Sequence, residues 1–266
     1  MTVSLIISTY NSPLFLRLCL ESAMRQSVLP DEILIADDGS GDETRSVVEE
    51  FRQRSAVPIV HVWHEDRGFR LTVIRNKAIA KARMDYVLQI DGDIVLHRCF
   101  VEDHKRFARK GCFATGSRLH LSPELTNRLV AESSIGVTAF TKGVGNRFNG
   151  IRCRLMTWLL QDSHSQNPAY VRGCNMAFWR SDLLMVNGYD ESMTGWGRED
   201  SEIACRLVNA GLRKRFIKNA GVEFHLYHPE NPRTQLNIND KILQRTIDEK
   251  RTWCTEGVAR YLTPEE

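Results

Sequence analysis

Three short apolar runs, separated by stretches with helical patterns, constrain the fold of this chain more than any other feature. They cover residues 3–8, 32–36 and 86–90, and each is largely continuous rather than alternating. A continuous apolar run is typical of a strand that is covered on both faces of a sheet. Such strands, alternating with helices, predict a doubly wound α/β fold built on a parallel sheet.

The segments between these runs carry signals of helix starts. Ser12 and Pro13 supply an N-cap and a proline in the first helical turn. Ser40 and Glu43 have the spacing of a capping box ahead of a second helix. Apolar spacing predicts further helices at about 72–83, 98–110 and 200–210, and a further strand at about 113–119.

The middle and the end of the chain are less regular. Residues 141–168 lack clear periodicity, although the mixed run at 151–160 predicts a short amphipathic helix. Packing of that helix into the core is favoured over contact with a membrane. The polar residues after about 230 are expected to be helical.

Composition argues against several classes of protein. The net charge is +3 and the basic residues are scattered, so the concentrated patch of a nucleic-acid binder is absent, and the cluster at 213–215 is interpreted as a solvated helix end. Seven scattered cysteines without a Cys-x-x-Cys pair indicate reduced core residues in a cytosolic protein. No basic leader precedes the first strand and no apolar run approaches the ~18 residues that span a bilayer. A soluble or peripheral protein is therefore expected.

Polar residues follow all three apolar runs. The C-terminal ends of parallel strands face one crevice, where open α/β sheets bind ligands. A nucleoside diphosphate bound there needs a cradle for its base, a group for its ribose and a cation for its phosphates. The residues that can supply these are Thr9, Tyr10, Asn11, Asp38, Asp91, Gly92 and Asp93.

Asp91 and Asp93 lie two residues apart in a glycine-containing turn after a buried strand. Two carboxylates held in this way repel each other unless a cation is present. Either both face one hard cation, or one binds the metal while the other takes the ribose or a water. His225 and His228 are the best further ligands, and His225 is favoured because it lies within an apolar run. Imidazole suits manganese better than magnesium.

A second informative segment runs from Gly195 and Trp196 to the acidic pair Glu199 and Asp200, at the start of a predicted helix. Tryptophan offers an apolar face on which a sugar ring can stack. The positive end of the helix dipole holds carboxylates of the first turn in their anionic form. A base in this turn is ready to take a proton from an acceptor hydroxyl.

The segment 64–77 is rich in cations, including Arg70, Arg75 and Lys77. One or two of them are expected to contact a diphosphate and the others to be surface charges. Within this segment, Asp66 and Arg75 are assigned to the nucleotide side of the site.

These segments, in their order, resemble glycosyltransferase family 2, a family of inverting enzymes with the GT-A fold. The resemblance covers about residues 3–230. Its last part is similar to a motif shared by chondroitin-polymerase-like bacterial transferases and animal β-1,4-galactosyltransferases. The matching motifs are Thr9-Tyr10-Asn11, Asp37-Asp38-Gly39-Ser40, Gly68-Phe69 with Arg75-Asn76, Asp91-Gly92-Asp93, and residues 172–178 and 187–191 leading into Gly195-Trp196-Gly197-Arg198-Glu199-Asp200.

The resemblance implies a division of labour along the chain. A Rossmann-like nucleotide-sugar-binding half would cover residues 1–115, an acceptor-binding and catalytic half 116–230, and a helical tail 231–266. The motif of residues 9–11 and Asp38 would surround the uridine. Asp200 would be the catalytic base, Glu199 would position the acceptor, Trp196 with Gly195 would line the acceptor pocket, and Asp93 with His225 would hold the metal.

The expected activity is inverting transfer of a hexose or N-acetylhexosamine from a UDP-sugar to a glycan or glycolipid, in surface polysaccharide or lipopolysaccharide assembly. Mn²⁺ is the expected cofactor, with Mg²⁺ as the alternative. The expected location is the cytoplasm, with contact at the inner face of a membrane left open. The sugar, the acceptor and the oligomeric state are also open.

Two alternatives belong to other classes. A sugar nucleotidyltransferase would need a glycine-rich loop after the first strand, and residues 8–12 do not form one. A non-catalytic nucleotide-sugar-binding protein would have no need of the pair Glu199 and Asp200.

Overall fold

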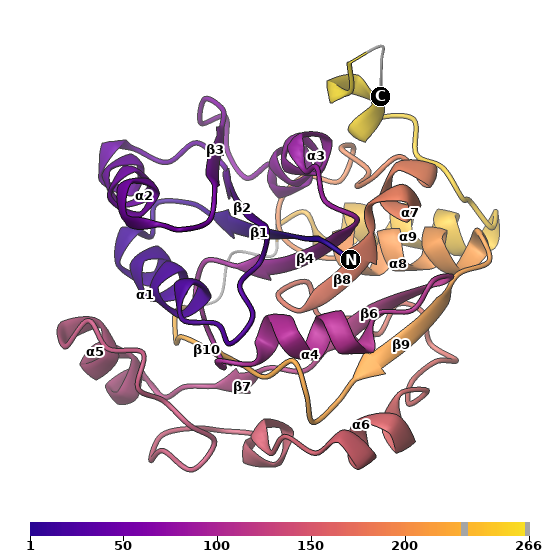
Figure 1. Cartoon of the computed structure of the whole chain (residues 1–266). Helices are drawn as coiled ribbons and strands as arrows, with labels where there is room; N and C mark the ends of the chain where they lie inside the picture. The colour runs from indigo at the N-terminus through magenta and orange to yellow at the C-terminus, as the bar shows by residue number, and fades with distance from the viewer. Residues whose placement is uncertain (230–233, 264–266) are drawn as a thin grey trace.

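The computed structural model describes residues 1–229 and 234–263. Within them, a large sheet has the strand order β3-β2-β1-β4-β8-β6-β9 (Figure 1). The strands at 3–8, 32–36 and 86–90 are confirmed and are parallel, whereas β8 is antiparallel to both neighbours. The sequence interpretation missed β3. The strands are β1 (Val3–Thr9), β2 (Glu32–Asp37), β3 (Ile59–Trp63), β4 (Tyr86–Asp91), β6 (Cys112–Gly116), β8 (Met176–Trp179) and β9 (Arg213–Ile217).

Helices cover both faces of this sheet (Figure 1). Side chains of β1 alternate between two cores, since Leu5 and Ile7 pack on one face and Ile6 on the other. Burying each such side chain stabilises the fold by about 1.5–3 kcal/mol. One face is covered by α1 (Pro13–Met24), α2 (Asp42–Arg54) and α4 (Phe100–Phe107), and the other by α3 (Leu71–Lys81), α7 (Arg180–Met185) and α8 (Glu199–Asn209).

A second, smaller sheet joins β5 (Ile94–Leu96), β10 (Glu223–His225) and β7 (Leu119–His120) in the order β5-β10-β7. It packs with α5 (Pro123–Ala131) around a third apolar core. The strand predicted at about 113–119 is confirmed as β6, but it ends at Gly116, and Leu119 begins β7 in the smaller sheet. The antiparallel pairing of β10 with β5 sets His225 opposite Ile94, directly after Asp93.

The first two helix starts differ from the predicted caps. Pro13 begins α1 and Ser12 occupies the N-cap position, but the Ser12 hydroxyl donates to the carbonyl of Tyr10 instead of capping the helix. The capping box predicted at Ser40 is wrong, because Gly41 is the N-cap of α2. The hydroxyl of Ser40 instead accepts a hydrogen bond from the backbone N–H of Asn11.

The segment 141–168 contains the short 3-10 helix η1 (Arg147–Gly150) and α6 (Arg154–Leu160). The prediction that this helix packs into the core is wrong. Leu155, Trp158 and Leu159 are 58–65% exposed, and Thr157 is the buried residue of α6. The apolar run therefore forms a surface helix.

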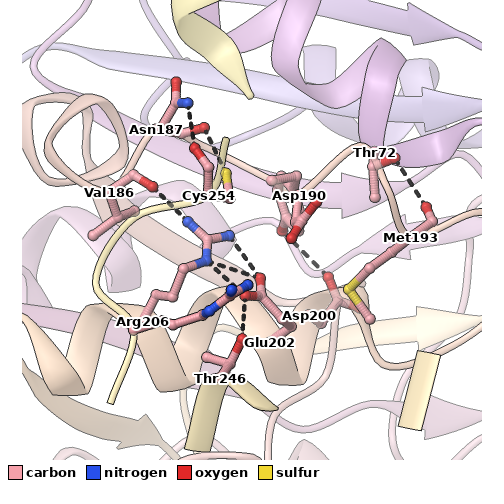
Figure 2. Close-up of polar contacts among 12 residues, drawn as sticks. Thr72, Val186, Asn187, Asp190, Met193, Asp200, Glu202, Arg206, Thr246 and Cys254 are labelled. Carbon is pink, nitrogen blue, oxygen red and sulfur yellow. Dashed lines mark hydrogen bonds and ion pairs between the residues drawn. The ribbon is translucent and has the colours of Figure 1, made fainter. Parts of the chain in front are cut away.

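The end of the chain forms α9 (Leu236–Asp248) and the 3-10 helix η2 (Val258–Tyr261), so the helix expected there is present. α9 is fastened to α8, because Thr246 donates to Glu202, which also pairs with the buried Arg206 (Figure 2). Residues 213–215, expected at a helix end, lie in β9 instead. None of the helices in the described part of the chain is long and apolar enough to cross a membrane.

Candidate active site

The ends of β1 and β2 form a polar cradle. Asp38 is 5% exposed and accepts hydrogen bonds from His64 Nε2 at 2.7 Å and from the backbone N–H of Arg70 at 2.8 Å. The hydroxyl of Tyr10 donates to Asp66 at 2.8 Å. Asp38 and Asp66, 28 residues apart in sequence, therefore both lie at this edge of the sheet.

Glycine is required where β2 turns into this cradle. Gly39 has a φ of +97°, and a Cβ at this position would lie 2.5 Å from Cα of Asp66. Any side chain would push the segment of Asp66 away from Asp38. The end of β1 contributes Thr9, whose hydroxyl is buried without a hydrogen-bond partner among the described residues, and it is followed by the half-exposed Tyr10.

Asp93, His225 and His228 meet at the junction of the two sheets. Their candidate ligand atoms all lie within 4.8 Å of one another. Nε2 of His228 is 3.0 Å and Nε2 of His225 is 3.6 Å from Oδ2 of Asp93. The structure thus places both of the histidines that were suggested from the sequence beside Asp93.

The ionisation of this cluster follows from burial and mutual contact. Burial lowers the pKa of His225 to about 4. The hydrogen bond to Asp93 raises the pKa of His228 to about 8. Burial opposes ionisation of Asp93, but the hydrogen bond from His228 and the charges of both histidines bring its pKa below the ordinary value.

The cluster fits a divalent transition metal. Oδ1 of Asp93 is buried without a hydrogen-bond partner among the described residues, so it has unused capacity to bind a cation. Nδ1 of His228 donates to the carbonyl of Pro229 at 2.7 Å, which leaves Nε2 to face Asp93. A second hydrogen bond of this kind commonly orients a metal-bound imidazole. Two imidazoles and one carboxylate suit a divalent transition metal better than they suit Mg²⁺ or Ca²⁺.

Arg75 lies at the centre of the site and is 1% exposed. Its Nη2 is 3.1 Å from Oδ1 of Asp91, and its Nη1 is 2.9 Å from Oδ1 of Asp200 and 3.7 Å from Glu199. Asp91 turns toward this guanidinium, while Asp93 turns toward the histidines. One buried cation therefore joins the end of β4 to the first turn of α8.

Asp200 is held from several directions. Besides Arg75, the hydroxyl of Tyr189 donates to its Oδ1 at 3.2 Å. Gly173 packs so closely against this carboxylate that a Cβ at its position would lie 1.8 Å from Oδ2. Gly173 is itself fixed, because Gln89 on β4 donates to its carbonyl at 2.9 Å. The carboxylate is therefore tightly positioned.

The sequence predicted that both acids of this turn are anionic, but the ionisation of Glu199 departs from that prediction. Burial, followed by the neighbouring charge of Asp200, raises the pKa of Glu199 well above its usual value, although Arg75 opposes the shift. Its Oε2 is buried without a hydrogen-bond partner among the described residues. Desolvation outweighs the helix dipole at this position.

The loop that carries Trp196 is fastened by the C-terminal segment. The Asn239 side chain on α9 donates to the carbonyls of Thr194 and Gly197, on either side of this tryptophan. Arg198, at the start of α8, pairs with Asp240 at 2.6 Å. Trp196 is 38% exposed.

Sequence reasoning overlooked two residues of the site. Tyr189 contacts Asp200, and the motif at 187–191 already contained it. Arg118 lies near the metal cluster, where its charge helps to lower the pKa of Asp93, and no sequence motif marked it. Glu199 and Asp200 lie in the first turn of α8 and Trp196 lies in the loop before it, and their roles stay predictions.

Two family models match consecutive parts of this chain. The family model described as glycosyl transferase family 2 matches residues 4–172, and that described as N-terminal domain of galactosyltransferase matches residues 162–229. The chain is 26% identical to chondroitin synthase from Escherichia coli over 262 residues, which cover 92% of this chain and 37% of that protein. The chain thus spans little more than a third of this relative.

Two solved structures share the fold. S. aureus TarS 1–349 in complex with UDP has a TM-score of 0.61 and 16% identity over 98% of this chain and 68% of that one. The mannosyltransferase PcManGT from Pyrobaculum calidifontis, in complex with GDP-Man and Mn²⁺, has a TM-score of 0.60 and 19% identity, covering 90% and 60% of the two chains. The GT-A fold expected from the sequence is confirmed.

Proposed function

Since this chain belongs to glycosyl transferase family 2, we propose that it is an inverting, metal-dependent enzyme that transfers a hexose or N-acetylhexosamine from a UDP-sugar to a hydroxyl of a glycan or glycolipid. The observation that carries the proposal is the contact of one buried guanidinium, that of Arg75, with both Asp91 and Asp200. It links the edge that would hold the leaving group to the carboxylate that would take the proton.

The donor is assigned to the half formed by residues 1–115. Uridine would lie against Thr9, Tyr10 and Asn11, with Asp38 and Asp66 supporting the wall of the cradle. Asp38 accepts one hydrogen bond on each oxygen, from His64 and from the backbone of Arg70. These bonds would orient the carboxylate, and each oxygen keeps a lone pair with which it would accept a hydrogen bond from the nucleotide. Asp91 and Gly92 would face the ribose side.

Asp93, His225 and His228 would hold the divalent ion, most naturally Mn²⁺. The bound ion would neutralise charge on the departing diphosphate. Adding His228 to the expected pair is supported by its 3.0 Å contact with Asp93 and by the orienting bond to Pro229. The cation Arg75 adds fixed positive charge beside Asp91.

Asp200 would act as the base. Arg75 and Tyr189 both donate to Oδ1 of Asp200, so Oδ2 would be the oxygen that takes the proton of the acceptor hydroxyl. The acceptor oxygen then attacks the anomeric carbon from the face opposite the nucleotide, which inverts the configuration. Glu199, neutral through its raised pKa, can donate a hydrogen bond to the acceptor, and Trp196 with Gly195 would pack against the acceptor ring.

The acceptor would occupy the half formed by residues 116–230, and the tail from 231 would support it through α9. Likeness to chondroitin synthase supports a role in polysaccharide assembly. Lipopolysaccharide assembly at the inner face of the cytoplasmic membrane is the related alternative. Neither a nucleotidyltransferase nor a binding protein is favoured by any feature of the site.

A donor screen tests the proposal. UDP-sugars and GDP-sugars are added to the protein with and without MnCl₂, and thermal stability is measured, followed by assay of transfer to a panel of oligosaccharides. We expect UDP-sugars to stabilise the protein in a manner that requires Mn²⁺ and one of them to be transferred. Stabilisation only by GDP-sugars would overturn the assignment of the donor. Binding of UDP-sugars that is unchanged when the metal is removed with a chelator would overturn the assignment of the metal.

A further inference from the structure

A polar cavity of about 180 Å³ opens beside the metal cluster, on the side away from the nucleotide cradle. It lies where β6, β7 and β9 end, whereas the cradle lies on β1 and β2, on the other side of β4 in the sheet. Three cations line it, together with an aromatic wall, and no described carboxylate does. These residues are Arg118, Arg172, Lys218, His120, Tyr170 and Phe216.

The cavity borders both parts of the site. The ring of His120 is 5.8 Å from that of His225, so one wall adjoins the metal cluster. Arg172 precedes Gly173, which packs against the carboxylate of Asp200. Ser201, next to Asp200, donates to the carbonyl of Ala169 at 2.9 Å, which fastens this wall to α8. A sugar next to the acceptor hydroxyl would reach the cavity.

The cations of this cavity are accessible, since Arg172 is exposed and Arg118 and Lys218 are half-buried. Within residues 1–229 and 234–263, Arg118, Arg172 and Lys218 make no ion pair with a carboxylate, and Nε of Arg118 is buried without a hydrogen-bond partner. Burial and the charges of the two arginines lower the pKa of His120. An anionic ligand would therefore pair with cations that no described carboxylate occupies.

The aromatic wall suits a ring. Tyr170 stacks on His164 with centroids 4.2 Å apart, and the guanidinium of Arg172 lies 5.0 Å above the Tyr170 ring. Arg172 is therefore held beside an apolar face. An arginine fork binds a carboxylate with two parallel hydrogen bonds, and an aromatic face packs against the sugar that bears it.

We propose that this cavity, the anionic acceptor pocket, binds the carboxylate of an acidic sugar in the acceptor glycan. The proposal rests on the proposed function, since it names the class of acceptor used by the same site. The acceptor would thus carry a uronic acid, with its carboxylate between Arg172 and Lys218 and its reacting hydroxyl toward Asp200.

Equilibrium binding without any donor tests the pocket. Methyl β-D-glucuronide, methyl β-D-glucoside and inorganic phosphate are each titrated into the protein and followed by NMR. We expect the glucuronide to bind at least about tenfold more tightly than the glucoside, the value of one charged hydrogen bond. Arg172→Gln and Lys218→Gln should each remove the preference. The control variant Arg213→Gln changes an exposed arginine of β9 that pairs with Asp162, and it should keep the preference for the glucuronide.

The other results overturn the inference. Equal binding of glucuronide and glucoside means that the cations do not recognise a carboxylate. A second contrary result has two parts: phosphate binds tightly while glucuronide is not preferred, and Arg172→Gln loses its affinity for UDP in MnCl₂. This result would assign the cations to the donor diphosphate. The titrations do not depend on turnover, so the two proposals can fail separately. Absence of transfer would count against the proposed function alone. Absence of glucuronide preference in an active transferase would count against the pocket alone.

Discussion

Arg75 and Asp200 are 125 positions apart in the sequence, yet Nη1 of the arginine lies 2.9 Å from Oδ1 of the aspartate in a buried site. The same guanidinium reaches Asp91 at 3.1 Å through its other terminal nitrogen. Nε of Arg75 also donates a hydrogen bond to the hydroxyl of Ser8, and the hydroxyl of Tyr189 donates one to Asp200. Removing the arginine would leave two carboxylates without their shared cation.

Arg75→Met should therefore reduce transfer at least about 100-fold, because preorganised charge at the reacting centre is lost. Arg75→Lys should recover only part of the rate, since an ammonium group cannot span both carboxylates as the guanidinium fork does. Steady-state kinetics measure both. Arg17→Lys is the matched control, because Arg17 forms a bidentate but partly exposed pair with Glu50. Equal activities of the two lysine variants would contradict the account.

Asp93→Asn and His228→Gln should each weaken Mn²⁺ binding by at least about 10–100-fold, as loss of a group that holds or orients a metal does. Isothermal titration calorimetry with MnCl₂ measures this directly. His61→Gln removes a different histidine–aspartate contact, with Asp37, and should leave the affinity unchanged. Unaltered Mn²⁺ affinity in His228→Gln would exclude this histidine from the ligand set.

The ion pair between Glu202 and Arg206 is fully buried, with both side chains at most 1% exposed. Glu202→Ala should lower the free energy of unfolding by about 3–5 kcal/mol, since it leaves the charge of Arg206 uncompensated. Urea unfolding measures the loss. Glu50→Ala, at the partly exposed pair with Arg17, should cost less than about 1 kcal/mol. The double variant Glu202→Leu with Arg206→Met should recover most of the loss, and a double variant as unstable as Glu202→Ala would contradict this.

His104 should make the fold sensitive to acid. Its ring is buried, its Nε2 donates to Asn175, and burial lowers its pKa to about 4. An unfolded histidine binds its proton near pH 6.5. The unfolded state thus gains the proton first, and stability that is complete above pH 6.5 is lost as pH falls toward 4, by about 2 kcal/mol at pH 5.

His104→Gln separates this effect from carboxylate titration. The difference in unfolding free energy between the wild type and this variant should shrink or reverse between pH 7 and pH 5. A difference that stays constant over this range would show that His104 does not carry the sensitivity.

Much of the donor half follows from sequence pattern. Continuous apolar runs mark β1, β2 and β4 because both faces of each strand are buried, and polar residues at their ends mark the crevice. The meeting of Asp93 with His225 and His228 depends on the pairing of β10 with β5, and the relative register of segments so far apart leaves no periodic signal in either. Residue chemistry suggested the two histidines as ligands and the family resemblance paired His225 with Asp93, but neither gives the register that brings them together.

Other features fail in sequence reasoning for identifiable reasons. Arg75 resembles its neighbouring surface cations in sequence, and its burial depends on Asp91 and Asp200 from other elements. The apolar run of α6 was expected in the core because apolar side chains usually pack there, but the core faces of the sheet are already covered by other helices. Arg118 belongs to no motif, so the cavity beside the metal cluster emerges only from the fold.

The most direct test of the account is Asp200→Asn, with transfer and donor binding measured in the same preparation. Asparagine keeps the size of the side chain but cannot accept the proton of the acceptor hydroxyl. Transfer should fall by about 10²–10⁴-fold, while calorimetry should find UDP binding in MnCl₂ close to that of the wild type. Transfer at nearly the wild-type rate would contradict the assignment of Asp200 as the base.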